Sequence, residues 1–152
     1  MQQRPVGGRM NQIMPRFTIV IPMLNEAETV PHLLGGCVAA AEGLGPYEIC
    51  VTDDGSTDAT GEALRAFGAA HPQANLTILK HPRPAGQSAA VHSAVRAARA
   101  PIIVTLDGDG QNPPEELPKL LNVLFDGPST LGLVAGQRVK RDDPMHKRVA
   151  SR

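Results

Sequence analysis

Short apolar runs alternate along the chain with segments that have helical spacing. The runs are rich in β-branched residues, as strands are, and the segments between them repeat apolar residues every three or four positions. This alternation predicts the α/β class, with right-handed crossovers and a mostly parallel sheet that carries helices on both faces. The expected strands cover residues 17–23, 47–52, 76–80, 102–106 and 131–136.

Capping residues set the expected starts of the helices. Asn25 is a candidate N-cap for a first helix that has acidic residues in its first turn. Ser56 or Thr57 can cap a second helix, and an alanine-rich third helix is expected over residues 87–100. Adjacent prolines at 113–114 favour the start of a fourth helix with its leucines on one face.

The fourth apolar run ends abruptly at two carboxylates, Asp107 and Asp109. Ligands of parallel sheets gather beyond the carboxyl ends of the strands, so chemistry is expected at this position. Two acids this close repel each other unless a cation or a set of donors compensates them, and hard oxygen ligands suit Mg²⁺ or Mn²⁺. Gln111 adds a neutral oxygen on the same turn. We therefore expect a divalent-metal site here, with a simple Asp-Gly turn as the alternative.

Further acidic residues follow the first two apolar runs, Glu26 after the first and Asp53 and Asp54 after the second. Because the carboxyl ends of parallel strands share one edge of a sheet, these side chains are expected to converge with the acidic pair of the fourth run. For Glu26 the alternative is a first-turn acid that the helix dipole favours. For Asp53 and Asp54 it is turn and cap chemistry.

Composition limits the class of protein and its partners. The chain has 152 residues, of which 41% are apolar and 20% charged, so we expect one globular domain over residues 14–152 after a disordered leader at 1–13. Aromatic residues make up only 3% and the formal net charge is zero, which argues against a nucleic-acid partner. The apolar stretch at 17–24 is too short to span a membrane. Cys37 and Cys50 fit buried thiols in a reducing cytoplasm.

Several familiar nucleotide and cation sites do not fit this sequence. A dinucleotide fold needs G-x-G-x-x-G after its first strand, where this chain has residues 22–26 instead. The P-loop pattern G-x-x-x-x-G-K-[ST] does not occur. A calcium loop that began at Asp107 would need glycine at its sixth position, where Asn112 stands. A response-regulator receiver would need its acidic pair after the first strand and a lysine after the fifth, and this sequence has neither in that form.

Three segments resemble, in order and spacing, the family 2 glycosyltransferases of GT-A fold. These segments are residues 21–26, 53–58 and 106–115, and the resemblance extends over residues 17–152. Within the family, the chain is most similar to the polyprenyl-phosphate glycosyltransferases of the dolichyl-phosphate mannose synthase type. The residues that carry this closer likeness are Gln111, Pro113, Pro114 and Glu115, then Gly136, Gln137 and Arg138, and finally Lys147, Arg148, Ser151 and Arg152.

The resemblance implies a donor-binding role for the residues that follow the first two strands. Pro22, Leu24 and Glu26 match the family's P-x-x-N-E segment around the donor base and ribose, although Leu24 stands where tyrosine is frequent. Asp53 and Asp54 match the acidic position that reads the base or the ribose.

The resemblance also implies the catalytic and metal-binding residues. Asp107, Asp109 and Gln111 match the D-x-D-x-Q site that holds the metal and the sugar-nucleotide diphosphate, with Gly108 between the two acids. Arg138 matches a basic residue near the transferred group. Negative charge builds on the departing nucleotide, so a divalent cation and an arginine stabilise the transition state of such a transfer.

The implied reaction moves a sugar from a UDP- or GDP-linked donor to a polyprenyl phosphate, with inversion. Lys147, Arg148 and Ser151 match the motif at the acceptor phosphate, and the basic segment 138–152 would be attracted to an anionic membrane. We therefore expect a cytoplasmic protein at the inner face of the membrane. Relatives usually continue well past residue 152, so the C-terminal part of the domain is expected to be missing. A truncated, non-catalytic nucleotide-sugar-binding module is the alternative.

Overall fold

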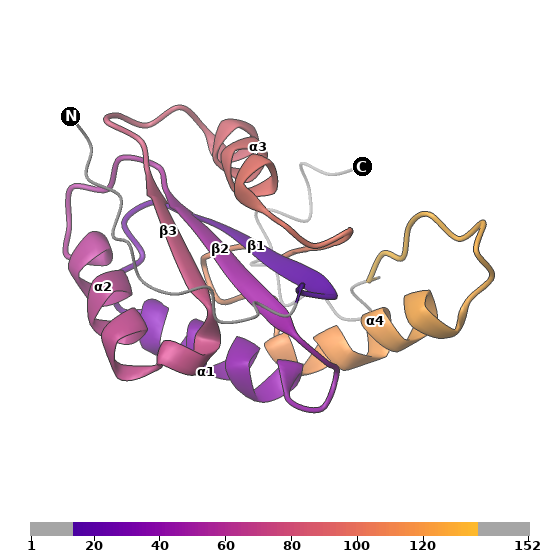
Figure 1. Ribbon diagram of the computed structural model, residues 1–152. Helices are drawn as coiled ribbons and strands as arrows, with labels where there is room; N and C mark the ends of the chain where they lie inside the picture. Colours follow the sequence, from indigo (N-terminus) through magenta and orange to yellow (C-terminus); the bar gives the residue numbers. More distant parts are fainter. Residues whose placement is uncertain (1–13, 137–152) are drawn as a thin grey trace, which may run out of the picture. The chain divides into compact units, whose positions relative to one another are not determined.

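A computed structural model describes residues 14–136 of the 152-residue chain (Figure 1). The chain divides into two compact units, one ending at Pro118 and the other beginning at Lys119. The expectations for residues 1–13 and for residues 137–152 lie outside the described part. The predicted site residues that fall there are Arg138, Lys147, Arg148 and Ser151.

The first unit contains a parallel sheet, and its strand order among the described residues is β3-β2-β1-β4. All three strand pairs are parallel, so each connection must cross over the sheet, as the predicted alternation requires. The α/β class and the first four predicted strands are confirmed. The strands are β1 (Phe17–Met23), β2 (Tyr47–Asp53), β3 (Leu76–Lys80) and β4 (Ile102–Thr105).

Helices cover both faces of the sheet, as predicted. Helix α3 packs against β1 and β2, and Figure 1 shows it on the opposite face of the sheet from α1 and α2. Short 3-10 turns precede β3 and α4. The helical elements are α1 (Val30–Ala41), α2 (Thr60–Ala70), η1 (Pro72–Ala74), α3 (Gln87–Ala97), η2 (Pro114–Glu116) and α4 (Leu117–Asp126).

The central strand β1 lies within the core of the first unit, and every one of its residues is buried. Burial of large apolar side chains such as those of Ile19 and Ile21 contributes about 1.5–3 kcal/mol each. The register pairs Met23 of β1 with Asp53 of β2, so these two strands end level with each other. The N–H of Leu106 donates to the carbonyl of Val20, which holds the segment after β4 against the same strand. The loops after β1, β2 and β4 therefore emerge side by side.

Two strand expectations are wrong. Residues 131–136 form no strand, because a strand exists only through hydrogen bonds to a neighbour and these residues have no strand partner in the described structure. The unbroken apolar run at 102–104 predicts a strand covered on both faces, yet Ile102, Ile103 and Val104 are half-buried and Thr105 is exposed. The reason is that β4 is an edge of the described sheet, with β1 as its pairing partner, whereas the covered centre is β1.

The predicted starts of the first two helices are also wrong. Asn25 has φ 57°, in the left-handed region, and α1 begins at Val30 with Pro31 in its first turn. Neither Ser56 nor Thr57 caps α2, which begins at Thr60. The side chains of Asn25, Ser56 and Thr57 instead form hydrogen bonds between the two loops.

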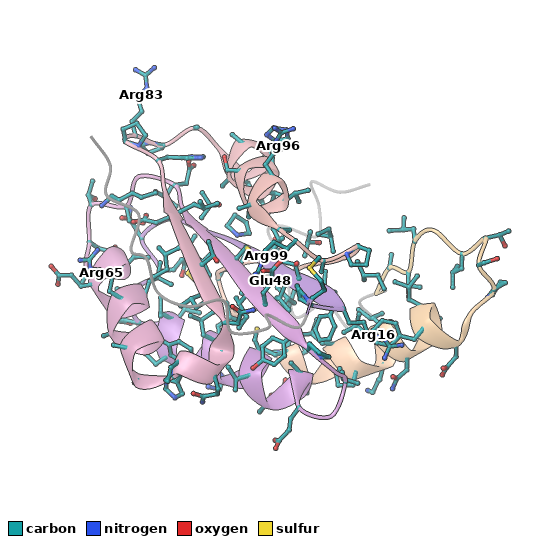
Figure 2. The ribbon with its side chains drawn as sticks, in the orientation of Figure 1. Arg16, Glu48, Arg65, Arg83, Arg96 and Arg99 are labelled. Carbon is teal, nitrogen blue, oxygen red and sulfur yellow. The ribbon has the colours of Figure 1, made fainter. Side chains whose placement is uncertain are left out.

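At the amino ends of the strands, the buried carboxylate of Glu48 joins three separate segments. Its Oε1 accepts hydrogen bonds from the Thr18 hydroxyl at 2.7 Å and from the N–H of Arg99 at 2.6 Å. Its Oε2 accepts from Nε of Arg99 at 2.8 Å, and Figure 2 shows the two side chains beside each other. This cluster ties β1 and β2 to the connection between α3 and β4.

Candidate functional site

A cleft of about 340 Å³ opens at the carboxyl ends of β1, β2 and β4. Its volume is within the range of small-molecule sites, and its position is the one where parallel sheets bind ligands. Residues from four segments line it. Those predicted from the sequence are Pro22, Leu24, Glu26, Asp54, Asp107, Gly108 and Asp109, and those not predicted are Met23, Pro84, Gly86, Gln87 and Ala90.

The acidic loop (residues 107–112) presents two carboxylates to the cleft in different ways. Asp107 is half-buried, and its oxygens accept hydrogen bonds from the side-chain amides of Gln87 at 2.8 Å and Asn112 at 3.0 Å. Asp109 is exposed, and its Oδ1 accepts the N–H of Gln111 at 3.0 Å. Asp107 is thus fixed in direction by neutral donors, whereas Asp109 is held by its own turn. Gln111 is exposed and is not among the residues that line the cleft.

Gly108 allows the acidic loop to lie directly against the end of β1. A Cβ at this position would stand 2.4 Å from the carbonyl oxygen of Pro22 and 2.8 Å from Cγ of Met23. Real Cβ atoms do not approach backbone so closely, so any side chain here forces the loop and the strand apart. The glycine is therefore needed to bring Asp107 and Asp109 to the edge of β1.

Replacing Gly108 with alanine is expected to lower the free energy of unfolding by about 1–3 kcal/mol, the usual cost of overpacking. The loop must move away from Pro22, so the two carboxylates move with it. The measurement is chemical denaturation of the variant beside Gly35→Ala, because a Cβ at Gly35 meets no atom within 4 Å. Equal unfolding free energies for the two variants would contradict this account of the loop.

The loops after β1 and β2 are joined by a set of polar contacts around Asn25. Its side-chain oxygen accepts the N–H of Thr57 at 2.9 Å, and its own N–H donates to Oγ of Ser56 at 2.9 Å. Glu26 donates its N–H to the hydroxyl of Thr60 at 2.8 Å. These bonds fix the backbone on which the Glu26 carboxylate stands at the cleft.

The two adjacent acids at the end of β2 have different surroundings, since Asp53 is the last residue of the strand and Asp54 follows it. Asp53 is buried and does not line the cleft; its Oδ1 accepts the N–H of Ser56 at 2.9 Å, and its Oδ2 lies 3.8 Å from Nζ of Lys80. Asp54 lines the cleft, and its oxygens accept the N–H groups of Ala85 and Gly86 at 2.9 and 2.8 Å. Of the two acids matched to the donor base or ribose, the structure therefore brings Asp54 to the cleft and not Asp53, because successive side chains of a strand point to opposite sides.

Hydrogen bonding keeps the Asp54 carboxylate ionised. Burial acts to raise its pKa, but the N–H of Ala85, the ring of His81 and the N–H of Gly86 all stabilise the charged form. The net result is that the pKa of Asp54 lies below its ordinary value. Asp54 is therefore a charged acceptor of several donors at the wall of the cleft.

The acidic pair fits a hard divalent cation. Asp107 and Asp109 both line the cleft, and the groups that hydrogen-bond their carboxylates are neutral amides. Among residues 14–136 there is no group of three or more His, Cys, Asp or Glu side chains that could enclose a metal by itself. Such a two-carboxylate arrangement suits Mg²⁺ or Mn²⁺, which keep several ligands from water and from substrate phosphates.

Comparison with known proteins decides the family. The profile of the family described as "Glycosyl transferase family 2" matches residues 18–151, which is most of the chain. This chain belongs to glycosyltransferase family 2. The recognition made from the three motifs is thereby confirmed.

Curated family 2 relatives are longer than this chain. An undecaprenyl-phosphate 4-deoxy-4-formamido-L-arabinose transferase from Yersinia enterocolitica is 38% identical over 138 residues. That match covers 90% of this chain and 41% of the relative. A protein of the same name from Yersinia pestis is 37% identical over 144 residues, and 43% of its length is covered. The chain thus spans about two fifths of the curated relatives it matches.

Solved structures share the fold of this family 2 chain. A mannosyltransferase from Pyrobaculum calidifontis, solved with GDP-Man and Mn²⁺, has a TM-score of 0.64 and 29% identity, and the match covers 74% of this chain and 33% of that one. Glucosyl-3-phosphoglycerate synthase from Mycobacterium tuberculosis, solved with Mn²⁺, UDP and glucosyl-3-phosphoglycerate, has a TM-score of 0.59 and 25% identity over 74% of this chain and 40% of that one. The GT-A fold is confirmed.

The residues that line the cleft include some that lie outside the three family motifs. The cleft brings together the segments after β1, β2 and β4, but it adds a fourth wall that no motif indicated, the loop after β3 with Pro84, Gly86 and Gln87. A signal for this wall was available, because the loop follows the end of a strand in the same parallel sheet. No helix within residues 14–136 has both the length and the apolar character that crossing a bilayer demands.

Proposed function

We propose that residues 14–152 form the donor-binding portion of a glycosyltransferase that transfers a sugar from a nucleoside-diphosphate sugar to a polyprenyl phosphate. The observation that carries this proposal is the convergence of Glu26, Asp54, Asp107 and Asp109 on one cleft, from three segments far apart in the sequence. Four acidic side chains at one edge of a sheet repel one another, and a bound divalent cation that also holds a polar ligand would offset this repulsion.

The cleft has features that suit a nucleoside diphosphate. The first residue of α3, Gln87, and the preceding Gly86 both line it. The first turn of a helix carries N–H groups without partners inside the helix, and its dipole favours negative charge. The solved relatives named above bind GDP-Man and UDP with Mn²⁺, which supports the same ligand class here.

Asp107 and Asp109 would hold the Mg²⁺ or Mn²⁺ ion. When bound, such a cation supplies charge stabilisation for the departing nucleoside diphosphate. The side-chain amides of Gln87 and Asn112 keep Asp107 in one orientation, so this ligand needs little reorganisation when a cation arrives. Gln111 remains a candidate third oxygen ligand on the same loop, as the family motif implies.

The proposed acceptor is a polyprenyl phosphate, in line with the undecaprenyl-phosphate transferases among the relatives. In an inverting transfer, an oxygen of the acceptor phosphate bonds to the anomeric carbon as the bond from that carbon to the diphosphate breaks. The acceptor is already an anion, so cationic side chains that position it matter more than a general base. We assign this role to Lys147, Arg148 and Ser151, and the contact near the transferred group to Arg138. The same basic segment would hold the protein at the inner, cytoplasmic face of the membrane.

Calorimetry with UDP, UDP-sugars and GDP-mannose, each with and without Mn²⁺, tests the donor half of the proposal. We expect either the uridine or the guanosine nucleotides to bind, and we expect that binding to be lost when Mn²⁺ is left out. No binding in any series would refute the donor site. Metal-dependent binding without transfer to undecaprenyl phosphate would instead favour the alternative, a nucleotide-sugar-binding module.

A further inference from the structure

A row of hydrogen bonds runs from the cleft wall into the protein behind it. Nδ1 of His81 lies 2.6 Å from Oδ1 of Asp54, and Nε2 of the same ring lies 2.9 Å from Oγ of Ser93. His81 follows directly after β3, and Ser93 is in the middle of α3. His81 and Ser93 are half-buried, and Asp54 is buried. The row therefore ties three segments together beneath the wall of the cleft.

The same Asp54 carboxylate holds the loop that forms this wall. It accepts the N–H groups of Ala85 and Gly86, directly before the start of α3. The next residue, Gln87, donates to Asp107 at 2.8 Å. A displaced Asp54 would free the backbone at 85–86, and the donor that orients Asp107 would then lose its fixed position.

We propose that His81 is a positioning residue for the cleft, which fixes the Asp54 carboxylate so that the loop before α3 and the Gln87 side chain keep their binding geometry. The ligand that this geometry would serve rests on the function proposed above. The role of His81 in holding Asp54 and the loop can be tested separately. The ring suits the task because Nδ1–H of a neutral ring can donate to the Asp54 carboxylate while Nε2 accepts from the Ser93 hydroxyl. That arrangement selects the tautomer with hydrogen on Nδ1.

A nucleophilic role for Ser93 does not fit the structure. The order of groups, acid to Nδ1 and hydroxyl to Nε2, is that of a hydrolase triad. Neither Ser93 nor His81 lines the cleft, however, and Ser93 lies within a helix. A substrate in the cleft meets Asp54 and not the hydroxyl, so the row can act on the site only through Asp54.

Amide hydrogen exchange at Ala85 and Gly86 tests the positioning role directly. In His81→Leu we expect both amides to exchange at least about tenfold faster than in the wild type, since bonds to a charged acceptor are among the stronger ones. His81→Asn should restore slow exchange, because its side-chain amide can donate to Asp54 from nearly the place of Nδ1. His92→Leu, an exposed histidine on α3, is the matched control and should change neither amide. Unchanged exchange in His81→Leu would overturn the proposal.

Ring nitrogen NMR and a milder variant cover the case in which His81→Leu does not fold. The wild-type ring should carry its hydrogen on Nδ1, and Ser93→Ala should increase the fraction of the other tautomer and speed exchange at Ala85 and Gly86. A wild-type ring with hydrogen on Nε2 would overturn the proposal, as would an unchanged tautomer and unchanged exchange in Ser93→Ala.

Binding of UDP or GDP in the presence of Mn²⁺ separates a positioning role from a structural one. At a temperature where every variant is folded, we expect His81→Leu to weaken binding of the nucleotide by about tenfold and His81→Asn to recover most of the affinity. If the wild type binds neither nucleotide, the proposed function fails, while the exchange rates still decide the role of His81. If it binds and His81→Leu binds equally well, the positioning role is wrong and the function stands.

Discussion

Replacing Asp109 with asparagine is expected to remove Mn²⁺-dependent binding of the nucleotide while leaving the fold unchanged. Asp109 is exposed on the loop after β4, and its hydrogen bond from the N–H of Gln111 can be accepted equally well by an asparagine oxygen. The variant therefore loses a charge that faces the cleft without losing a structural contact. Because even residues behind a metal ligand change affinity by about 10–100-fold, we expect at least a 100-fold loss by calorimetry.

The matched control is Glu28→Gln, which removes the same charge at an exposed position outside the cleft lining. It should bind nucleotide and metal as the wild type does. Both variants should melt within about 2 °C of the wild type, as surface substitutions usually do. Asp109→Asn with wild-type affinity in the presence of Mn²⁺ would mean that the acidic loop is an ordinary turn.

Asp107→Asn makes a useful comparison, because this carboxylate has a structural task as well. Both of its oxygens accept from side-chain amides, of Gln87 and of Asn112. An asparagine would turn one acceptor into a donor and place N–H against N–H. The expected result is therefore the same loss of binding together with a measurable loss of stability, unlike Asp109→Asn.

Much of the fold was predictable because strand and helix periodicity are local properties of the sequence. The run at 102–106 and the alternation of elements were enough to give a parallel sheet and to place Asp107 and Asp109 at its carboxyl edge. Helix starts were less predictable. Asn25 has the chemistry of an N-cap, but its side chain bonds to the backbone of Thr57 in another loop, and a single sequence does not show which competing partner wins.

The adjacent acids Asp53 and Asp54 show a different limit. The sequence predicts both at the ligand edge of the sheet, yet side chains alternate along a strand, so two adjacent residues at a strand end point to opposite sides. Which one faces the cleft depends on the register of β2 against β1 and β3, which is set by residues far away in the sequence. The structure puts Asp54 on the wall of the cleft and Asp53 in the interior.

The wall formed after β3 was missed for a related reason. The histidines of the chain have no metal-ligand spacing, so the sequence alone predicts for His81 no more than an ordinary surface or loop residue. Its partners Asp54 and Ser93 are 27 and 12 residues away in the sequence and meet it only through the strand order of the sheet. Contacts of this kind follow from topology, which periodicity does not specify.

Replacing Glu48 with alanine is expected to lower the free energy of unfolding by about 2–4 kcal/mol. The substitution leaves the buried hydroxyl of Thr18 and the N–H of Arg99 without their acceptor, which costs roughly 1–3 kcal/mol for each group that water cannot reach. It also opens a small cavity. The guanidinium of Arg99 adds little, because it is 40% exposed and can be solvated instead. Chemical denaturation measures the change, and Glu42→Ala, at an exposed position, is the control that should lie within about 0.5 kcal/mol of the wild type.

Acid pH tests the same cluster without removing its side chain. Burial acts to raise the pKa of Glu48, but the N–H of Arg99, the hydroxyl of Thr18 and the guanidinium outweigh it, so the pKa lies below the ordinary value of 4.5. A carboxyl with a depressed pKa in the folded state contributes stability that is fully present above its unfolded-state pKa and is lost as the pH falls through the folded-state value. The wild type should therefore lose stability as the pH falls below about 4.5, and Glu48→Gln, which is less stable at pH 7, should lose less over the same interval. Parallel pH profiles for the two proteins would show that the Glu48 carboxylate does not stabilise the fold through its charge.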